Sequence, residues 1–266
     1  MRPARTVLAF GLVFLYLPLL VVMTYSFNAS RLVTVWTGLS TQWYGELLAD
    51  RQILAAAGNS LIVAMFSASL ATVIGTSAGL AFARFGGFRG RTLLAGAMAA
   101  PLVLPEVIAG ISLLLLFIAL EQTFAWMPGR GIATLVIAHA GFTTSYVAVI
   151  VQARLSGMER DIEEAAADLG AKPFTVFRAI TLPMLRPALV SGWLLAFVLS
   201  LDDLVISSFV AGPQSTTLPM VVFSSIRLGV SPKVNALATI LIVVTLAVLA
   251  AAAWIGLSRQ KGRAIS

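Results

Sequence analysis

The sequence contains no cysteine, few charged residues and a single histidine. Without cysteine the chain can form no disulfide bond, no thiolate metal site and no cysteine nucleophile. Charged residues make up 11% of the chain, whereas soluble domains average about 25%. That is too little charge to cover a surface that faces water, so the composition argues against a soluble domain.

Long apolar stretches take the place of the missing charges, and hydrophobic residues make up 59% of the 266 residues. The interior of a bilayer offers no water to backbone groups, so a chain crosses it as helices or as a closed barrel. Barrel strands alternate in hydrophobicity over about ten residues, but the stretches in this sequence are continuous and longer. The sequence therefore predicts an all-α, polytopic membrane protein.

A helix needs about 20 apolar residues to cross the hydrocarbon core of a bilayer. Charge-poor stretches of suitable length predict six spans, at residues 6–30, 52–83, 92–120, 131–153, 187–211 and 234–258. The apolar run of the first stretch exceeds the roughly 7–15 residues of a signal-peptide core. We therefore expect it to be a retained span rather than a cleaved signal.

The Lys and Arg residues are distributed unevenly between the two ends of these spans. Six spans place both termini on one side, and 13 of the 18 basic residues lie on that side. Basic residues accumulate in cytoplasmic loops, so both termini are expected in the cytoplasm. The net charge of +7 is then a signal of topology. A nucleic-acid-binding role is not indicated, because the sequence has no basic patch interleaved with stacking aromatic residues.

We expect three parts along the chain. Residues 1–56 hold the first span and an outer loop, residues 57–257 hold a core of five helices, and residues 258–266 form a cytoplasmic tail. The most polar segment lies inside the core, between the fourth and fifth spans, at residues 154–186. That segment is the first candidate for contact with another protein.

A short amphipathic helix is predicted within this polar segment. Apolar residues from Ile162 to Leu169 recur at i, i+3, i+4 and i+7, which is the spacing of one helix face. Asp161 is expected to cap the helix, with Glu164 as its capping-box partner. Gly170 stands where a C′ glycine ends a helix. A second helix is expected to follow this glycine turn and to lead into the fifth span.

The second helix is expected to begin at Pro173, which suits a first turn, and to end at Leu182-Pro183. Seven residues of the segment also form a longer motif. They are Glu164, Ala165, Ala166, Gly170, Ile180, Leu182 and Pro183. Their spacing, and their place between the fourth and fifth of six spans, resemble the EAA motif of binding-protein-dependent ABC importer permeases. We call residues 164–183 the EAA loop.

The resemblance implies a type I ABC importer permease fold, in which this loop is a coupling helix that docks into a cleft of a cytoplasmic ATPase subunit. A short helix with a small apolar face fits a groove, while its carboxylates meet basic residues at the rim. Glu163 and Asp168 are therefore expected to join the motif residues in ATPase coupling. The chain has no G-x-x-x-x-G-K-[ST] sequence. We expect no catalytic residue, metal or cofactor on it, and ATP used by a partner dimer of ATPase subunits.

Three carboxylates lie within the predicted spans. Glu106 lies in the third span beside Pro101 and Pro105, which loosen the helix, and Asp202 and Asp203 lie in the fifth. An acidic residue at the centre of a span costs roughly 2.5–3.5 kcal/mol on insertion scales, so these residues are expected to face a cavity or a partner. No Lys or Arg lies at the same depth in this chain. We favour a path for a cationic substrate, and pairing with another subunit or a capped helix break is the alternative.

The runs around these carboxylates are similar to those of the polyamine (spermidine/putrescine) permeases, on the putrescine side. They lie at residues 105–106, 110–114, 199–205, 208–209, 212–213, 218–219 and 229–239. This resemblance implies transport of a polyamine across the bacterial inner membrane. It also implies three partners besides membrane lipid: the ATPase dimer, a second homologous permease subunit and a periplasmic polyamine-binding protein.

A proton-coupled secondary transporter of a cationic solute is the alternative function. In that case Glu106, Asp202 or Asp203 would carry protons through the membrane. Only the EAA motif argues against it, because a secondary transporter has no use for a loop that docks an ATPase.

An intramembrane serine protease is a further possibility, because residues 75–79 match G-x-S-x-G and could act with His139. The strand-turn-helix context of that motif is absent from the predicted spans. We favour a structural interpretation, in which Gly75 and Gly79 form a small-residue face for helix packing. His139 is then expected to be a packed, hydrogen-bonded residue of its span.

Overall fold

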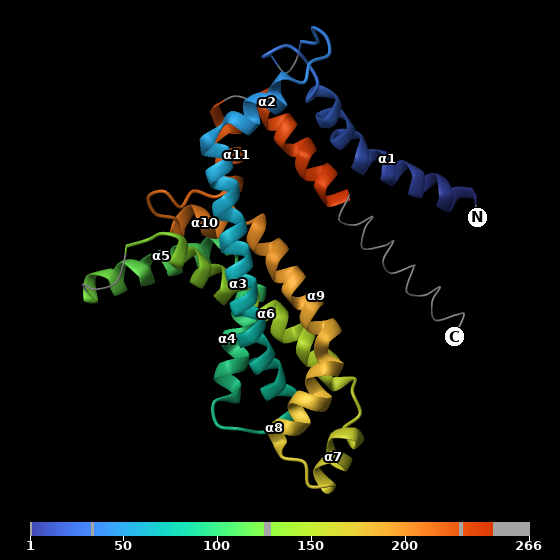
Figure 1. Cartoon of the computed structure of the whole chain (residues 1–266), viewed down its shortest axis with the longest axis vertical. Coiled ribbons are helices and arrows are strands. Elements are labelled where there is room, and N and C mark those ends of the chain that lie inside the picture. Colours follow the sequence, from blue (N-terminus) through green and yellow to red (C-terminus); the bar gives the residue numbers. More distant parts are fainter. Residues whose placement is uncertain (1, 33–34, 125–128, 229–230, 247–266) are drawn as a thin grey trace. The chain divides into compact units, whose positions relative to one another are not determined.

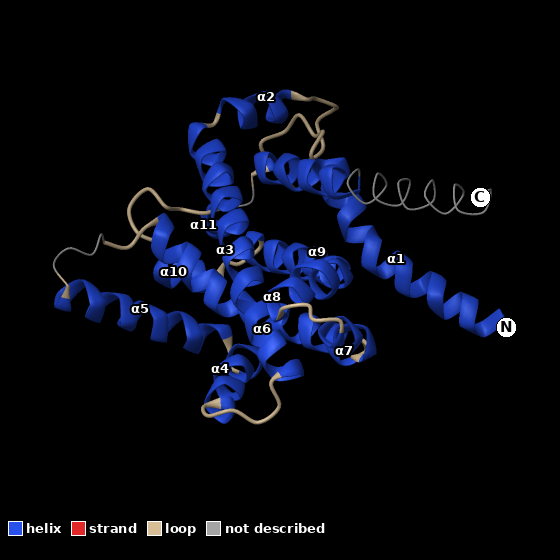
Figure 2. Cartoon of the chain, turned by 60° about the horizontal axis from the view of Figure 1, so that its bottom comes forward, coloured by secondary structure: helices blue, strands red, loops and turns tan. Residues whose placement is uncertain are grey.

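The computed structural model describes residues 2–32, 35–124, 129–228 and 231–246. These residues are mainly helical and contain no strand apart from an isolated bridge between Asn28 and Leu39 (Figure 2). The elements are α1 (Arg2–Tyr25), α2 (Gln42–Ala49), α3 (Arg51–Arg84), α4 (Arg91–Val103), α5 (Glu106–Thr123), α6 (Ile132–Ser156), α7 (Asp161–Asp168), α8 (Pro173–Val176), the π-helical turn η1 (Phe177–Thr181), α9 (Leu182–Leu201), α10 (Val205–Val210) and α11 (Leu218–Leu228) (Figure 1). The predicted all-α class is confirmed.

Within the described part of the chain, five helical stretches are long and apolar enough to cross a membrane. They are Arg5–Tyr25, Arg51–Arg84, Glu106–Thr123, Ile132–Ser156 and Pro173–Leu201. They coincide with the first five predicted spans, although the third span is shorter than predicted and the fifth begins earlier. The sixth predicted span begins in an apolar helix, Pro232–Leu246, and its remainder lies outside the described residues.

The third predicted span is two helices rather than one. Leu104 and Pro105 are extended, with ψ of 139° and 135°, and they separate α4 from α5. The ring of a proline disfavours the helical conformation for the residue before it, and here Leu104 is extended and ends the first helix. Pro101 lies inside α4 and causes no such break. Glu106 is therefore the first residue of a new helix and not the middle of a continuous span.

The chain divides into two compact units, residues 1–54 with 222–266, and residues 55–221. In the first unit, the segment after α1 is organised around Asn28, which is fully buried. Its side chain donates to the carbonyl of Val35 (2.8 Å) and accepts from the N–H of Thr37 (3.1 Å). Its own carbonyl accepts from the indole of Trp43 (2.6 Å). One buried amide thus fixes the conformation of the connection between α1 and α2.

The start of α3 is capped within the same unit. Asp50 Oδ1 accepts hydrogen bonds from the N–H groups of Gln52 (3.1 Å) and Ile53 (3.2 Å), and Lys233 Nζ lies 3.2 Å from Asp50 Oδ2. Burial alone would raise the pKa of Asp50, but these bonds and the Lys233 charge hold it below its ordinary value of 3.8. The carboxylate form of Asp50 therefore stabilises the start of the helix.

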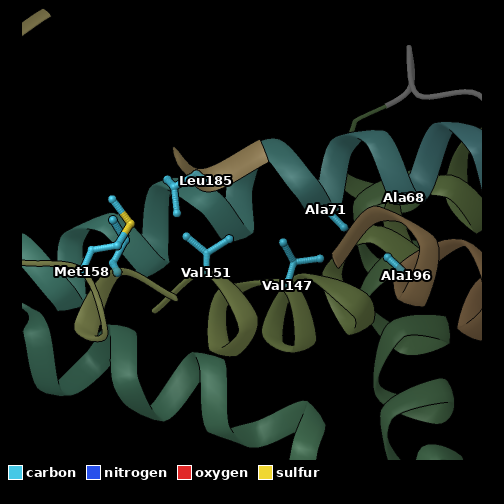
Figure 3. Close-up of a cluster of buried hydrophobic side chains, with 8 residues drawn as sticks. Ala68, Ala71, Val147, Val151, Met158, Leu185 and Ala196 are labelled. Carbon is cyan, nitrogen blue, oxygen red and sulfur yellow. The ribbon is translucent and has the colours of Figure 1, made fainter. Parts of the chain in front are cut away.

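The core of the second unit lies between α3, α6 and α9 (Figure 3). Its buried side chains are alanines on α3 and mostly larger residues on α6, on α9 and in the segment after α6. They are Ala68, Ala71, Val147, Val151, Leu155, Met158, Leu185 and Ala196. A second cluster joins α3, α5, α6 and α10 through Val63, Phe117, Leu135, Ala138, Ile206 and Val210. Helices α6 and α9 therefore form the centre, and α5 packs on α10.

The small-residue face predicted on the second span is confirmed. A methyl group added to Gly75 would lie 2.7 Å from Val147 Cβ and 2.8 Å from the carbonyl oxygen of Thr144. One added to Gly79 would lie 2.9 Å from a methyl of Val151. Both contacts are on α6, so the two glycines allow α3 and α6 to approach closely.

Candidate functional site

The first helix of the polar segment is α7, and it ends at Gly170 as predicted. Gly170 has a φ of +85°, in the left-handed region that glycine enters without a steric penalty. Its N–H donates to the carbonyl of Ala167 (2.8 Å), and the N–H of Ala171 donates to that of Ala166 (3.0 Å). These two bonds form a Schellman motif, so the predicted C′ position is confirmed.

The predicted capping box of α7 is wrong. Asp161 is the first helical residue, Arg160 occupies the N-cap position, and no side chain caps the helix. Asp161 and Glu164 instead lie in the first turn with Glu163, where the positive end of the helix dipole favours carboxylates. The helix begins one residue earlier than it would with Asp161 as its N-cap. The acidic residues of the first turn stabilise its N-terminus by their charge instead of by a capping hydrogen bond.

Several side chains of the polar segment are exposed in and just after its first helix. Leu169 is 90% exposed, Phe174 71% and Ile162 51%, and no residue of α7 is buried. Of the nine residues predicted to couple to an ATPase, four are exposed, namely Glu164, Ala165, Asp168 and Gly170. The other five are half-buried, namely Glu163, Ala166, Ile180, Leu182 and Pro183. The exposed side chains are available for contact with another protein.

Glu163 differs from its neighbours because its carboxylate points back into the protein. Glu163 Oε2 lies 3.0 Å from Arg84 Nε, and Oε1 accepts a hydrogen bond from the Thr181 hydroxyl (2.7 Å). The Arg84 and Glu163 side chains are only 13% and 17% exposed. Arg84 also donates to the carbonyl of Leu155 (3.2 Å). Glu163 thus joins α7 to the end of α3 and to η1, and Arg84 in turn joins this pair to α6.

The second helix of the loop does not end at Leu182-Pro183, and that prediction is wrong. α8, η1 and α9 follow one another without a break from Pro173 to Leu201. The N–H of Leu182 bonds to the carbonyl of Phe177, five residues back, as in a π-helical turn. A wider turn relieves the clash that a proline ring makes in a regular helix, so the helix continues past Pro183.

Asp203 has a partner within the chain, contrary to the expectation from the sequence. Its Oδ2 lies 3.3 Å from Nε2 of His139, and the two side chains are 9% and 2% exposed. Its oxygens also accept from the N–H groups of Ile206 (3.2 Å) and Ser207 (2.7 Å). The expectation was based on the positions of Lys and Arg, whereas the partner is the single histidine. Asp203 therefore caps α10 and ties it to α6.

His139 is the packed, hydrogen-bonded residue that was predicted. Its Nδ1 lies 2.7 Å from the hydroxyl of Ser200, and its Nε2 lies 3.1 Å from that of Ser207. Ser67 of α3 donates to Ser200 in turn (2.9 Å). A polar network thus joins four helices inside the apolar core, and its members satisfy one another's hydrogen bonds.

Asp202 and Glu106 are exposed, unlike Asp203. Asp202 follows the last residue of α9, and Glu106 begins α5. Among the described residues neither carboxylate makes an ion pair. The three carboxylates are therefore of two kinds, one that makes contacts inside the chain and two that are exposed on its surface.

Ser77 shows none of the geometry of a nucleophile. Its hydroxyl donates to the carbonyl of Val73 one turn earlier (2.9 Å), as exposed helical serines do. Both ring nitrogens of His139 are engaged by Ser200, Ser207 and Asp203. The packing of Gly75 and Gly79 therefore supports a structural role for the G-x-S-x-G run, and the geometry of Ser77 does not support a protease.

Two sets of partners were not predicted from the sequence, namely Arg84 and Thr181 as partners of Glu163, and Ser200 and Ser207 as partners of His139. Each set is joined by contacts between residues at least 61 positions apart, except for Thr181 and Glu163. No periodicity or motif reports such contacts. The only available signal was that His139 is the one titratable base within a span.

Comparison with known proteins gives one family and close relatives. The family described as "Binding-protein-dependent transport system inner membrane component" matches residues 71–260. The chain is 56% identical over 236 residues to the putrescine transport system permease protein PotI of Escherichia coli K12, covering 89% of this chain and 84% of that one. It is 41% identical over 249 residues to the spermidine/putrescine transport system permease protein PotC of the same organism, covering 94% and 92%.

Solved structures share the fold at low sequence identity. A bacterial ABC transporter involved in the import of alginate matches with a TM-score of 0.69 at 13% identity, covering 95% of this chain and 94% of that one. The methionine ABC transporter MetNI matches with a TM-score of 0.62 at 16% identity, covering 75% and 92%. These likenesses confirm the predicted importer permease fold.

Proposed function

Since the chain belongs to the family of binding-protein-dependent transport system inner membrane components, we propose that it is a permease subunit of an ATP-driven polyamine importer. The exposed EAA loop is the observation that supports coupling of this chain to an ATPase. Helix α7 ends in a Schellman motif, and exposed apolar side chains lie on it (Ile162), at its C-cap (Leu169) and on the following α8 (Phe174). An apolar face of this size on a short helix suits a groove on a partner.

Polyamine as the substrate is supported by the relatives and by charge. PotI and PotC are named for putrescine and spermidine transport. Polyamines are polycations, and a carboxylate in a low-dielectric path attracts a cation more strongly than it does in water. Asp202 and Glu106 are exposed carboxylates at ends of helices. We assign them to the substrate path, with Asp203 adding its charge from a position fixed by His139.

The partners follow from this role. A dimer of ATP-binding subunits would bind the EAA loop, with Glu164, Asp168 and the exposed apolar side chains as contacts. A second, homologous permease subunit would complete the path, and a periplasmic binding protein would deliver the polyamine. ATP would bind the ATPase subunits and not this chain. The transporter is then a two-state element, biased by nucleotide at one end and by the loaded binding protein at the other.

Uptake by the complete transporter in proteoliposomes tests the substrate. The chain is reconstituted with its partner permease and ATPase, with ATP inside and the loaded binding protein outside. We expect uptake of labelled putrescine that unlabelled putrescine or spermidine inhibits and methionine does not. The Asp202→Asn variant is expected to lower this uptake at unchanged expression, whereas Glu159→Gln, an exposed carboxylate outside the site, is not. Uptake that unlabelled polyamines do not inhibit would reject the proposal that the substrate is a polyamine.

A further inference from the structure

We infer that Glu163, Arg84 and Thr181 form a latch that fixes α7 to the end of α3, so that movement imposed on α7 is transmitted to the spans. This inference rests on the proposed function. It separates Glu163 from the exposed carboxylates of the loop and assigns it to an internal contact. Arg84 and Thr181, which belong to no motif, become positioning residues for coupling.

The structure shows why α7 needs such a contact. The helix has eight residues, none of them buried. A pocket of about 410 Å³ lies beside it, lined by residues of α3, α7, α8 and η1 that include Leu80, Arg84, Glu163, Ala167 and Thr181. Close packing therefore does not fill the space between α7 and α3. Arg84 and Glu163, which form the ion pair, both line this space.

The latch residues connect α7 with three other helical elements, namely α3, α6 and η1, so movement of α7 can be passed to each of them. Arg84 lies in the last turn of α3, where the negative end of the helix dipole favours a cation. It reaches Glu163 on α7 through Nε (3.0 Å) and the carbonyl of Leu155 on α6 through Nη1 (3.2 Å). Thr181 joins the same carboxylate to η1 (2.7 Å). The carboxylate thus connects α7 directly to α3 and η1, and Arg84 extends the connection to α6.

A second bond repeats the connection and does not depend on Glu163. Arg160, at the N-cap position of α7, donates to the carbonyl of Ala83 in α3 (2.7 Å). Without the latch, α7 keeps this bond, its packing against α8 and η1, and its Schellman turn. We therefore expect the helix to persist and to bind the ATPase, but to move relative to α3.

The coupling ratio, polyamine taken up per ATP hydrolysed, tests the latch in the reconstituted transporter. Arg84→Gln and Glu163→Gln are each expected to lower the ratio by about 2- to 30-fold, the range that corresponds to coupling changes of 0.5–2 kcal/mol. ATPase binding should be unchanged. The effect of the double variant should be smaller than the sum of the two single effects, because each single variant already removes the shared Arg84–Glu163 ion pair. Arg89→Gln and Glu159→Gln are the matched controls, since both residues are exposed.

A distance measurement makes the test independent of the substrate. The chain has no cysteine, so Ser77→Cys on α3 and Asp161→Cys on α7 accept two spin labels at exposed positions. The distribution of label distances in the assembled transporter should be narrow and should broaden in Arg84→Gln. Broadening without any polyamine uptake by the parent transporter would reject the proposed function and keep the latch. An unchanged distribution, an unchanged coupling ratio, additive effects in the double variant or loss of ATPase binding would each overturn the latch.

Discussion

Replacing Gly75 by alanine should destabilise the contact between α3 and α6. The added methyl would lie 2.7 Å from Val147 Cβ and 2.8 Å from the carbonyl oxygen of Thr144, whereas carbon atoms pack best at about 3.5–4.0 Å. The side chain of Val147 can adjust its rotamer, but its Cβ and the carbonyl oxygen are fixed to the backbone of α6. The two helices must therefore separate by several tenths of an ångström.

Two effects of opposite sign determine how far Gly75→Ala changes the free energy of unfolding. Overpacking of a core costs roughly 1–3 kcal/mol, and the higher helix propensity of alanine returns about 1 kcal/mol. A net loss of about 0–2 kcal/mol is expected for Gly75→Ala. Gly58 lies on the same helix and has nothing within 4 Å of its Cβ position. Gly58→Ala therefore isolates the propensity effect and should be neutral or stabilising by up to about 1 kcal/mol.

Unfolding in mixed micelles by titration with SDS, followed by circular dichroism, measures the difference between the two variants. We expect Gly75→Ala to unfold at lower SDS than the parent and Gly58→Ala at the same or higher SDS, separated by about 1–3 kcal/mol. If Gly75→Ala is as stable as Gly58→Ala, the close approach of α3 to α6 is not a stabilising feature of the fold.

Three further predictions concern Asp203, Gly170 and Asp50. Asp203→Ala removes the carboxylate that pairs with His139 and that accepts from the first turn of α10, so it should lower the stability to heat, by about 0.5–2 kcal/mol, whereas Asp202→Asn should not. Gly170→Asp forces a side chain into a left-handed conformation, at roughly 1–2 kcal/mol, and should abolish uptake while membrane insertion persists. The folded state lowers the pKa of Asp50 below 3.8, so the unfolded state binds more protons at low pH. The stability from this cap should be present above about pH 4 and lost as the pH falls further.

Each of these has an outcome that contradicts it. Equal midpoints of thermal unfolding for Asp203→Ala and Asp202→Asn would show that the network around His139 does not hold α10. Normal uptake by Gly170→Asp would remove the EAA loop from coupling. An acid transition in Asp50→Asn as steep as that of the parent would mean that other carboxylates set the pH dependence.

Features that depend on local chemistry were predictable from the sequence. The spans follow from continuous apolar runs, and the end of α7 follows from a glycine that alone suits a left-handed residue. The packing role of Gly75 and Gly79 follows from their spacing of four residues along one helix face. In each case the residues that decide the structure belong to one continuous stretch of the chain.

Features that depend on contacts between distant helices were not predictable. Asp203 pairs with His139 on a different helix, and Arg84 reaches Glu163 across 79 positions of the chain. The continuation of the helix past Pro183 depends on a π-helical turn, which no residue pattern in the loop announces. The sequence identified the charged residues whose burial in a membrane costs free energy. The structure was needed to identify the hydrogen-bond and ion-pair partners of those that are buried.

The energy source for uptake tests the central claim most directly. Proteoliposomes that contain the complete transporter are loaded with ATP, or with a non-hydrolysable analogue, in the presence and absence of a protonophore. The account predicts putrescine uptake that requires hydrolysable ATP and persists when the proton gradient is collapsed. Uptake that follows the proton gradient and ignores ATP would contradict it and would make Glu106 and Asp202 candidates for proton carriers.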